Sequence, residues 1–253
     1  MLTTAPAAPH GQYCVTIPFS PDELAAVDET VEVLLADAGI DGPPVDAFLL
    51  AKRLRLAVGR DDFQEGRARC VRLQGRRGRA PAVAALLRED PRPERNQWAL
   101  AHEIAEQAVC RVYERLGIRP GETPPGRREA FANCMAGRLL VPSRWFLEDG
   151  RASDWDVFAL KSLYPTASHE LIARRMLTCP PTIVVAVHDH GRLTWRQSNA
   201  GYLPRLSQDE TTARRIAHES TLPVTEGSAT SWPIHEPGWK REITRTWLAD
   251  AFF

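Results

Sequence analysis

A long helical pattern in the middle of the chain constrains the fold more than any other feature of the sequence. The segment RPERNQWALAHEIAEQAVCRVYERLG, residues 92–117, has apolar residues at spacings of three and four and ends at a glycine, which is typical of a helix end. One buried stripe is predicted along this helix: Trp98, Ala101, Ile104, Ala105, Ala108 and Val112. Glu103, Gln107 and Arg111 are expected on the opposite side.

The same helix contains a pattern of acid and imidazole groups, H-E-x-x-E, formed by His102, Glu103 and Glu106. His102 and Glu106 are four residues apart, so they lie on one strip, at the border of the buried stripe. A zinc peptidase normally has H-E-x-x-H here, with both histidines binding the metal. Glu106 has no Lys or Arg three or four residues away. The spacing alone leaves two interpretations open, a metal ligand pair or a solvated polar strip.

A second helix carries a further carboxylate. The segment RREAFANCMAGRLLV, residues 127–141, predicts a helix that Pro142 ends. Glu129 lies in its first turn, where the helix dipole favours an acid. Its strip also holds four other residues, three of them non-polar: Ala132, Asn133, Ala136 and Leu140. A carboxylate on such a face needs a partner, and a metal shared with His102 and Glu106 would provide one.

These two blocks resemble the ImmA/IrrE family of metallopeptidases. In that family the first block usually reads R-x-x-x-A-H-E-x-x-H, and the second begins E-x-x-A-N and ends L-L-M-P. This chain has RNQWALAHEIAE and REAFANCMAGRLLVP at the same spacing. Residues 43–58 resemble the family's short helix before its first strand, and residues 159–177 resemble its helix-turn-helix-like element. The resemblance covers roughly residues 40–180, and it is specific in the two central blocks.

The resemblance implies a role for each site residue. His102 is the first metal ligand, Glu106 the second and Glu129 the third, and Glu103 is the general base. The chain departs from the family at Glu106, where a histidine is usual. Carboxylates bind zinc at about 2.0–2.2 Å, so this departure permits a metal. The added negative charge weakens the ion as a Lewis acid, and it shifts the expected preference from Zn²⁺ toward Mn²⁺ or Fe²⁺.

The resemblance also implies an activity and a substrate class. The expected protein is a metal-dependent endopeptidase that hydrolyses a peptide bond in a protein substrate, with a metal-bound water activated by Glu103. The expected substrate is a DNA-binding repressor or an antitoxin-like regulator. The alternative is a non-catalytic regulatory or partner-docking protein that keeps the fold with a degenerate or purely structural metal site.

The predicted fold class is α+β, with a mainly helical, zincin-like metallopeptidase domain that contains a small sheet. Residues 1–20 form a flexible tail in this prediction, and residues 21–150 form the metallopeptidase-like domain. A helix-turn-helix-like element follows at 151–180, and a small C-terminal α/β region at 181–253. No internal repeat is evident.

Local signals place several further elements. Ser20 and Glu23 predict a capping box at the start of a helix over 20–40, and Ser207 and Glu210 predict another before a later helix. RARCVRL alternates like a strand and runs into the turn QGRRGR, whereas APAVAALL is ambiguous between strand and helix. A hairpin is predicted around the turn at 189–191. The two histidines there, His188 and His190, are expected in a solvated turn.

Composition excludes several classes of protein. Hydrophobic residues make up 43%, charged residues 25%, and the formal net charge is zero, so nothing in the overall charge favours nucleic acid or a membrane surface. Arg174 and Arg175 could face DNA, but the nearby Glu170 and the neutral chain argue against direct DNA binding. No signal peptide and no run of eighteen apolar residues is present, and the expected location is the cytoplasm.

The five cysteines are scattered and include no C-x-x-C pair, so neither a disulfide framework nor a cysteine-based zinc finger is expected. Cys110 and Cys134 fall in predicted helices and are expected to be small core residues.

Overall fold

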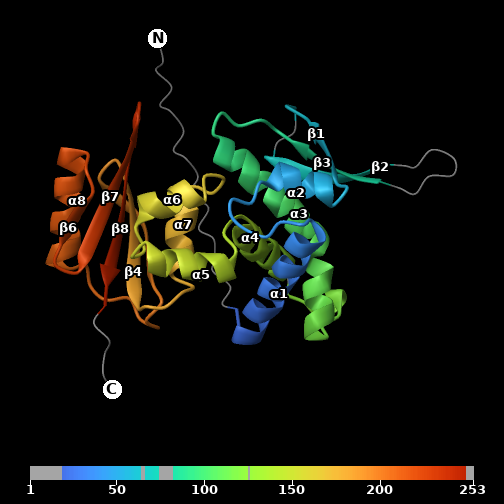
Figure 1. Ribbon diagram of the computed structural model, residues 1–253, viewed down its shortest axis with the longest axis horizontal. Coiled ribbons are helices and arrows are strands. Elements are labelled where there is room, and N and C mark those ends of the chain that lie inside the picture. Colours follow the sequence, from blue (N-terminus) through green and yellow to red (C-terminus); the bar gives the residue numbers. More distant parts are fainter. Residues whose placement is uncertain (1–18, 64–65, 74–81, 125, 249–253) are drawn as a thin grey trace, which may run out of the picture.

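The computed structural model describes residues 19–63, 66–73, 82–124 and 126–248 (Figure 1). Within these residues the chain has an α+β fold with eight α-helices, a three-stranded mixed sheet and a five-stranded antiparallel sheet. The helices α1, α3 and α4 and the small sheet lie at one end of the molecule, and the larger sheet lies at the other (Figure 1). Most of the predicted tail, residues 1–18, is outside the described residues.

The first helix, α1 (Pro21–Asp37), begins at the predicted capping box, with Ser20 and Glu23 each bonding the other's backbone N–H. The second, α2 (Ala47–Arg53), is shorter than predicted. Arg55 takes a positive φ of 60°, which a helix cannot accommodate, and the chain continues as a strand.

The small sheet has the order β1-β3-β2. Strands β1 (Ala57–Arg60) and β3 (Ala82–Leu87) pair in parallel, and β2 (Ala68–Leu73) pairs antiparallel to β3. Within the ambiguous segment APAVAALL, residues 82–87 therefore form a strand, and the strand predicted in RARCVRL is confirmed. The predicted turn QGRRGR lies outside the described residues.

Three helices form the core next to this sheet. The long helix α3 (Pro93–Leu116) is closed by Gly117 in the left-handed conformation, as predicted. A short 3-10 turn, Pro120–Glu122, leads toward α4 (Arg127–Leu140), which packs against both α3 and α1. Cys110 was expected in the core, but it is exposed because it lies on the outer side of α3.

Three short helices connect the two ends of the molecule: α5 (Ser143–Ala152), α6 (Val157–Leu163) and α7 (His169–Met176). The sequence does not predict helix α5, because its buried residues, Phe146 and Gly150, are too few to give a clear helical pattern. Asp156 caps α6, and its other carboxylate oxygen accepts a hydrogen bond from Trp232 Nε1 at 2.9 Å, which ties these helices to the larger sheet.

The larger sheet has the order β5-β4-β8-β7-β6 and is antiparallel throughout. Its strands are β4 (Ile183–Asp189), β5 (Arg192–Ser198), β6 (Val224–Glu226), β7 (Ala229–Glu236) and β8 (Trp239–Trp247). Helix α8 (Gln208–Ser220) begins at the predicted Ser207/Glu210 capping box and covers the outer face, while α5, α6 and α7 lie on the inner side (Figure 1). Among the described helices, none is both long and apolar enough to cross a membrane.

Candidate metal centre

Helices α3 and α4 bring the three predicted ligand residues together. One donor atom of each of His102, Glu106 and Glu129 lies within 4.8 Å of the donors of the other two. His102 and Glu106 come from successive turns of α3, and Glu129 comes from the first turn of α4. The spacing in the sequence predicted the first pair, and the packing of the two helices adds the third residue.

Asn133 connects two of these side chains. Its amide nitrogen donates to Glu129 Oε1 at 2.9 Å, and its Oδ1 lies 3.1 Å from His102 Nδ1. A proton on Nδ1 would be donated to Asn133, and Nε2, which lies 3.6 Å from Glu129 Oε2, would then keep its lone pair. This is the tautomer that a metal ligand needs. The sequence places Asn133 on the same strip as Glu129 but does not indicate this orienting role, because His102 lies on another helix.

Glu106 has a partner that the sequence did not indicate. Arg128 of α4 donates from Nε to Glu106 Oε2 at 2.8 Å and from Nη2 to the Glu106 carbonyl at 3.0 Å. The sequence of α3 has no Lys or Arg three or four residues from Glu106, and the counter-ion comes from the neighbouring helix. The charge of Glu106 is therefore balanced without a metal, and any bound cation competes with the Arg128 guanidinium.

Glu103 was expected opposite the buried stripe, and this prediction is wrong. Its side chain is buried, with 7% of the residue exposed, because α3 packs against α4 on one side and against β2 and β3 on another. Cys70 of β2 lies against it, with Sγ 3.9 Å from the Glu103 carbonyl oxygen. Burial raises the pKa of Glu103, and burial together with the Glu103 carboxyl group raises the pKa of Cys70 to about 12.

The three donors fit a divalent cation. One imidazole nitrogen and two carboxylates are ligands that Zn²⁺, Mn²⁺ and Fe²⁺ accept. The exposed fractions of the side chains are 18% for His102, 23% for Glu106 and 61% for Glu129, so water can reach the ligand atoms. The orientation of His102 by Asn133 is a further feature of metal sites. The Arg128–Glu106 ion pair opposes binding, because it occupies a ligand oxygen.

A second group of candidate ligands lies in the C-terminal region, where the sequence analysis had none. His218, His235 and Glu242 place their donor atoms within 4.8 Å of one another. They come from three different elements, and no local spacing joins them. The prediction of a solvated turn is also wrong for His188, which is buried in β4, whereas His190 is exposed at the turn.

The arginines of α7 are engaged within the fold. Arg174 pairs with Glu170 at 2.7 Å and lies over the Trp195 ring, 4.2 Å from its centroid. Arg175 is buried and donates to the Val141 carbonyl at 3.1 Å. Neither side chain extends freely into solvent in this arrangement.

No protein-family model matches the chain, and no curated protein matches it. A solved structure of a Mycobacterium tuberculosis transcriptional regulator has a similar fold, with a TM-score of 0.60 at 14% sequence identity. The similarity covers 90% of this chain and 81% of that chain. At this identity it concerns the fold alone.

Proposed function

We propose that the chain is a metal-dependent endopeptidase of the ImmA/IrrE type. One observation carries the proposal: His102, Glu106 and Glu129 converge from α3 and α4, and Glu103 follows His102 directly in the chain. The proposed ligands are these three residues, and the proposed ion is Zn²⁺, with Mn²⁺ or Fe²⁺ as the other candidates. The proposed place of action is the cytoplasm.

The chain's own residues supply proton transfer and orientation. When bound, a divalent ion would polarise the scissile carbonyl and lower the pKa of water. Glu103 would accept the proton that the attacking water loses and return it to the leaving amine nitrogen, so its carboxyl group ends the cycle as it began. Burial of Glu103, which is 7% exposed, holds this carboxyl group away from bulk water. Asn133 would keep His102 in the tautomer whose Nε2 is free to bind.

The small sheet supports a polypeptide substrate. Strand β2 is at the edge of the sheet order β1-β3-β2, and its residue Cys70 contacts Glu103. An extended peptide can pair with an exposed strand edge through backbone hydrogen bonds. A segment added alongside β2 would pass next to Glu103. The proposed substrate is a regulatory protein such as a DNA-binding repressor or an antitoxin-like regulator, which would present such a segment.

The replacement Glu103→Gln tests this proposal. The full chain is loaded with Zn²⁺ or Mn²⁺ and incubated with β-casein and a library of internally quenched peptides. Removing a general base typically slows turnover by 10²–10⁴-fold, so we expect a loss of at least about 100-fold with the metal content unchanged. Glu114→Gln, an exposed site on the same helix, is the matched control. Equal cleavage by Glu103→Gln and the parent protein would contradict the proposed role of Glu103.

A non-catalytic regulatory protein that docks a partner is the second candidate. The Arg128–Glu106 ion pair favours it, because this pair satisfies the atypical carboxylate without a metal. Direct DNA binding is not part of this proposal, since Arg174 and Arg175 are held by contacts within the fold.

Elemental analysis separates the two candidates. The peptidase proposal expects close to one Zn, Mn or Fe at the α3–α4 site, lost in both Glu106→Ala and Glu129→Ala. A protein that takes up no metal at this site after dialysis against Zn²⁺ or Mn²⁺ would support the docking candidate.

A further inference from the structure

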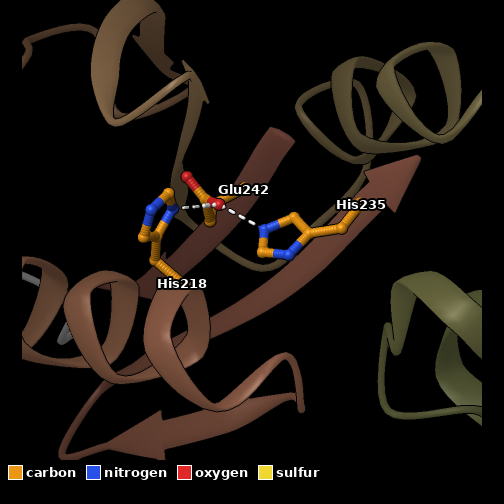
Figure 2. A group of neighbouring side chains, drawn as sticks. All are labelled: His218, His235 and Glu242. Atoms are coloured by element: carbon orange, nitrogen blue, oxygen red, sulfur yellow. Dashed lines mark hydrogen bonds and ion pairs between the residues drawn. The ribbon is translucent and has the colours of Figure 1, made fainter. Parts of the chain in front are cut away.

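The C-terminal unit contains a second constellation of metal-ligating side chains, formed by His218, His235 and Glu242. Figure 2 shows that the three side chains point toward one another, with His218 coming from a helix and the other two from strands. His218 lies in the last turn of α8, His235 near the end of β7 and Glu242 in β8.

The strand register explains why the two strand residues meet. His235 is opposite Lys240, and Pro233 is opposite Glu242, so His235 and Glu242 are diagonal neighbours on one face of the sheet. Helix α8 packs on β7 and β8 and places His218 against this pair. The site therefore exists only when α8 is docked on the hairpin.

Both imidazoles contact the same carboxylate oxygen, Glu242 Oε1. His218 Nδ1 lies 2.8 Å from Glu242 Oε1, and His235 Nε2 lies 2.7 Å from that atom (Figure 2). The two rings are edge to face, with their centroids 5.6 Å apart. Two nitrogens and one carboxylate thus surround one small volume.

The Glu242 carboxylate is in a buried position that usually requires a cationic partner. Glu242 is 0% exposed, and its second oxygen, Oε2, has no hydrogen-bond partner among the described residues. The ion pairs that it makes in the part of the chain that is described are with the two histidines. A buried carboxylate with one oxygen unsatisfied is costly, and such groups are usually paired or bind a metal.

A second polar atom without a partner lies on the same face. His188 of β4 is directly opposite Glu242 in the register of β4 and β8. It is buried, and its Nδ1 has no hydrogen-bond partner within the described residues. Glu242 Oε2 and His188 Nδ1 thus lie on neighbouring strands without hydrogen-bond partners among the described residues. Buried polar atoms usually have a partner, so an additional polar group or ion is expected at this part of the sheet.

We propose that His218, His235 and Glu242 bind a divalent transition-metal ion of the Zn²⁺ class. Two imidazole nitrogens and one carboxylate are a ligand set for zinc, with a fourth position left for water or another ligand. Ligand atoms within 4.8 Å of one another need only small side-chain shifts to reach metal–ligand distances of about 2.0–2.2 Å. The nitrogen donors favour this class over Mg²⁺ or Ca²⁺.

The ion has a route to the site, because the side chains of His218 and His235 are 30% and 15% exposed. Binding would connect α8 to the β7–β8 hairpin through the metal and so stabilise the C-terminal unit. This proposal is independent of the peptidase proposal, since the two sites share no residue.

The test uses the full chain with the α3–α4 ligands replaced, Glu106→Gln together with Glu129→Gln. Metal-free protein is titrated with Zn²⁺, and the ring nitrogens of the histidines are followed by NMR. We expect one equivalent of Zn²⁺ to shift the ring signals of His218 and His235 and to raise the Tm. Adding His235→Asn should weaken Zn²⁺ binding at least 100-fold, whereas adding His190→Asn, an exposed histidine in the same unit, should leave it unchanged.

The parent chain gives a second readout that does not depend on whether a variant folds. Its His218 and His235 signals should also shift with Zn²⁺. Folded protein whose two rings stay unshifted at a stoichiometric excess of Zn²⁺ would overturn the proposal. Binding that is equally tight in the protein with and without His235→Asn would also overturn it.

Discussion

The two histidine–glutamate clusters of this protein use similar donor atoms in opposite surroundings. In the α3–α4 cluster, Glu129 is mostly exposed and Glu106 is paired with Arg128. In the C-terminal cluster, Glu242 is fully buried and has no arginine or lysine partner in the ion pairs of the described residues. The first cluster can therefore exist without a cation at little cost, whereas the second has a buried carboxyl group whose ion-pair partners among the described residues are the two imidazoles.

In this protein a sequence motif points to one cluster, whereas a buried carboxylate with an unsatisfied oxygen points to the other. The α3–α4 cluster has the recognisable motif, and its charges are satisfied by protein or by water. The C-terminal cluster has no local spacing motif, yet Oε2 of its buried carboxylate lacks a hydrogen-bond partner within the described part of the chain.

The largest expected difference is in stability without metal. Glu242→Ala breaks the hydrogen bonds to two histidines and leaves a cavity in the buried face of the sheet, and we expect the free energy of unfolding to fall by about 3 kcal/mol. Glu129→Ala removes an exposed carboxylate, and we expect a change of less than about 0.5 kcal/mol. Urea unfolding of both chelator-treated variants measures this difference. Equal losses would mean that burial does not separate the clusters.

The next largest effect concerns the orientation of His102. Asn133→Ala removes the hydrogen bonds to His102 and Glu129, and we expect metal affinity at the α3–α4 site to fall about 10–100-fold, as for other residues that orient ligands. Competition with a chromophoric chelator measures the affinity. The C-terminal site should keep its affinity in the same variant, which provides an internal control.

A smaller effect is expected at the competing guanidinium. Arg128→Ala frees Glu106, and because an exposed ion pair is worth up to about 1 kcal/mol, we expect metal to bind up to about fivefold more tightly. Arg144→Ala, at an exposed position on α5, serves as the control. Weaker binding in Arg128→Ala would show that the arginine supports the site instead of competing with the metal.

The smallest expected effect is the pH dependence of stability that His169 contributes at the junction between the two ends of the molecule. Burial lowers the pKa of His169 to about 4, and Lys161 of α6 adds to the shift, while Glu94 of α3 and Glu236 oppose it. Arg241 of β8 also lowers this pKa.

Since the pKa of His169 is lower in the folded state than its ordinary value of 6.5, the unfolded chain binds the proton more readily between these values. The stability that this residue contributes is complete above pH 6.5 and is lost as the pH falls toward 4. We expect an effect of about 1 kcal/mol or less, because the ring is only partly buried. Unfolding of the parent and His169→Phe between pH 7 and 4 measures it, and parallel pH profiles would contradict the assignment.

Much of the fold was predictable because its signals are local. The capping boxes at Ser20 and Ser207, the closing glycine at 117 and the turn near 190 depend on residues close in sequence. The end of α2 was not predicted, because the positive φ at Arg55 leaves a weak pattern in the sequence. Helix α5 was not predicted, because it is short and has little buried surface.

Helical periodicity is enough to identify which residues of α3 and α4 could form a site, because it places His102 and Glu106 on one strip and Glu129 in a first turn. The surroundings of these residues depend on the tertiary structure, which provides the Arg128 partner of Glu106, the Asn133 bridge and the burial of Glu103. It also decided the whole cluster of His218, His235 and Glu242. The reason is that periodicity describes one element at a time, whereas charge balance and burial depend on which elements pack together.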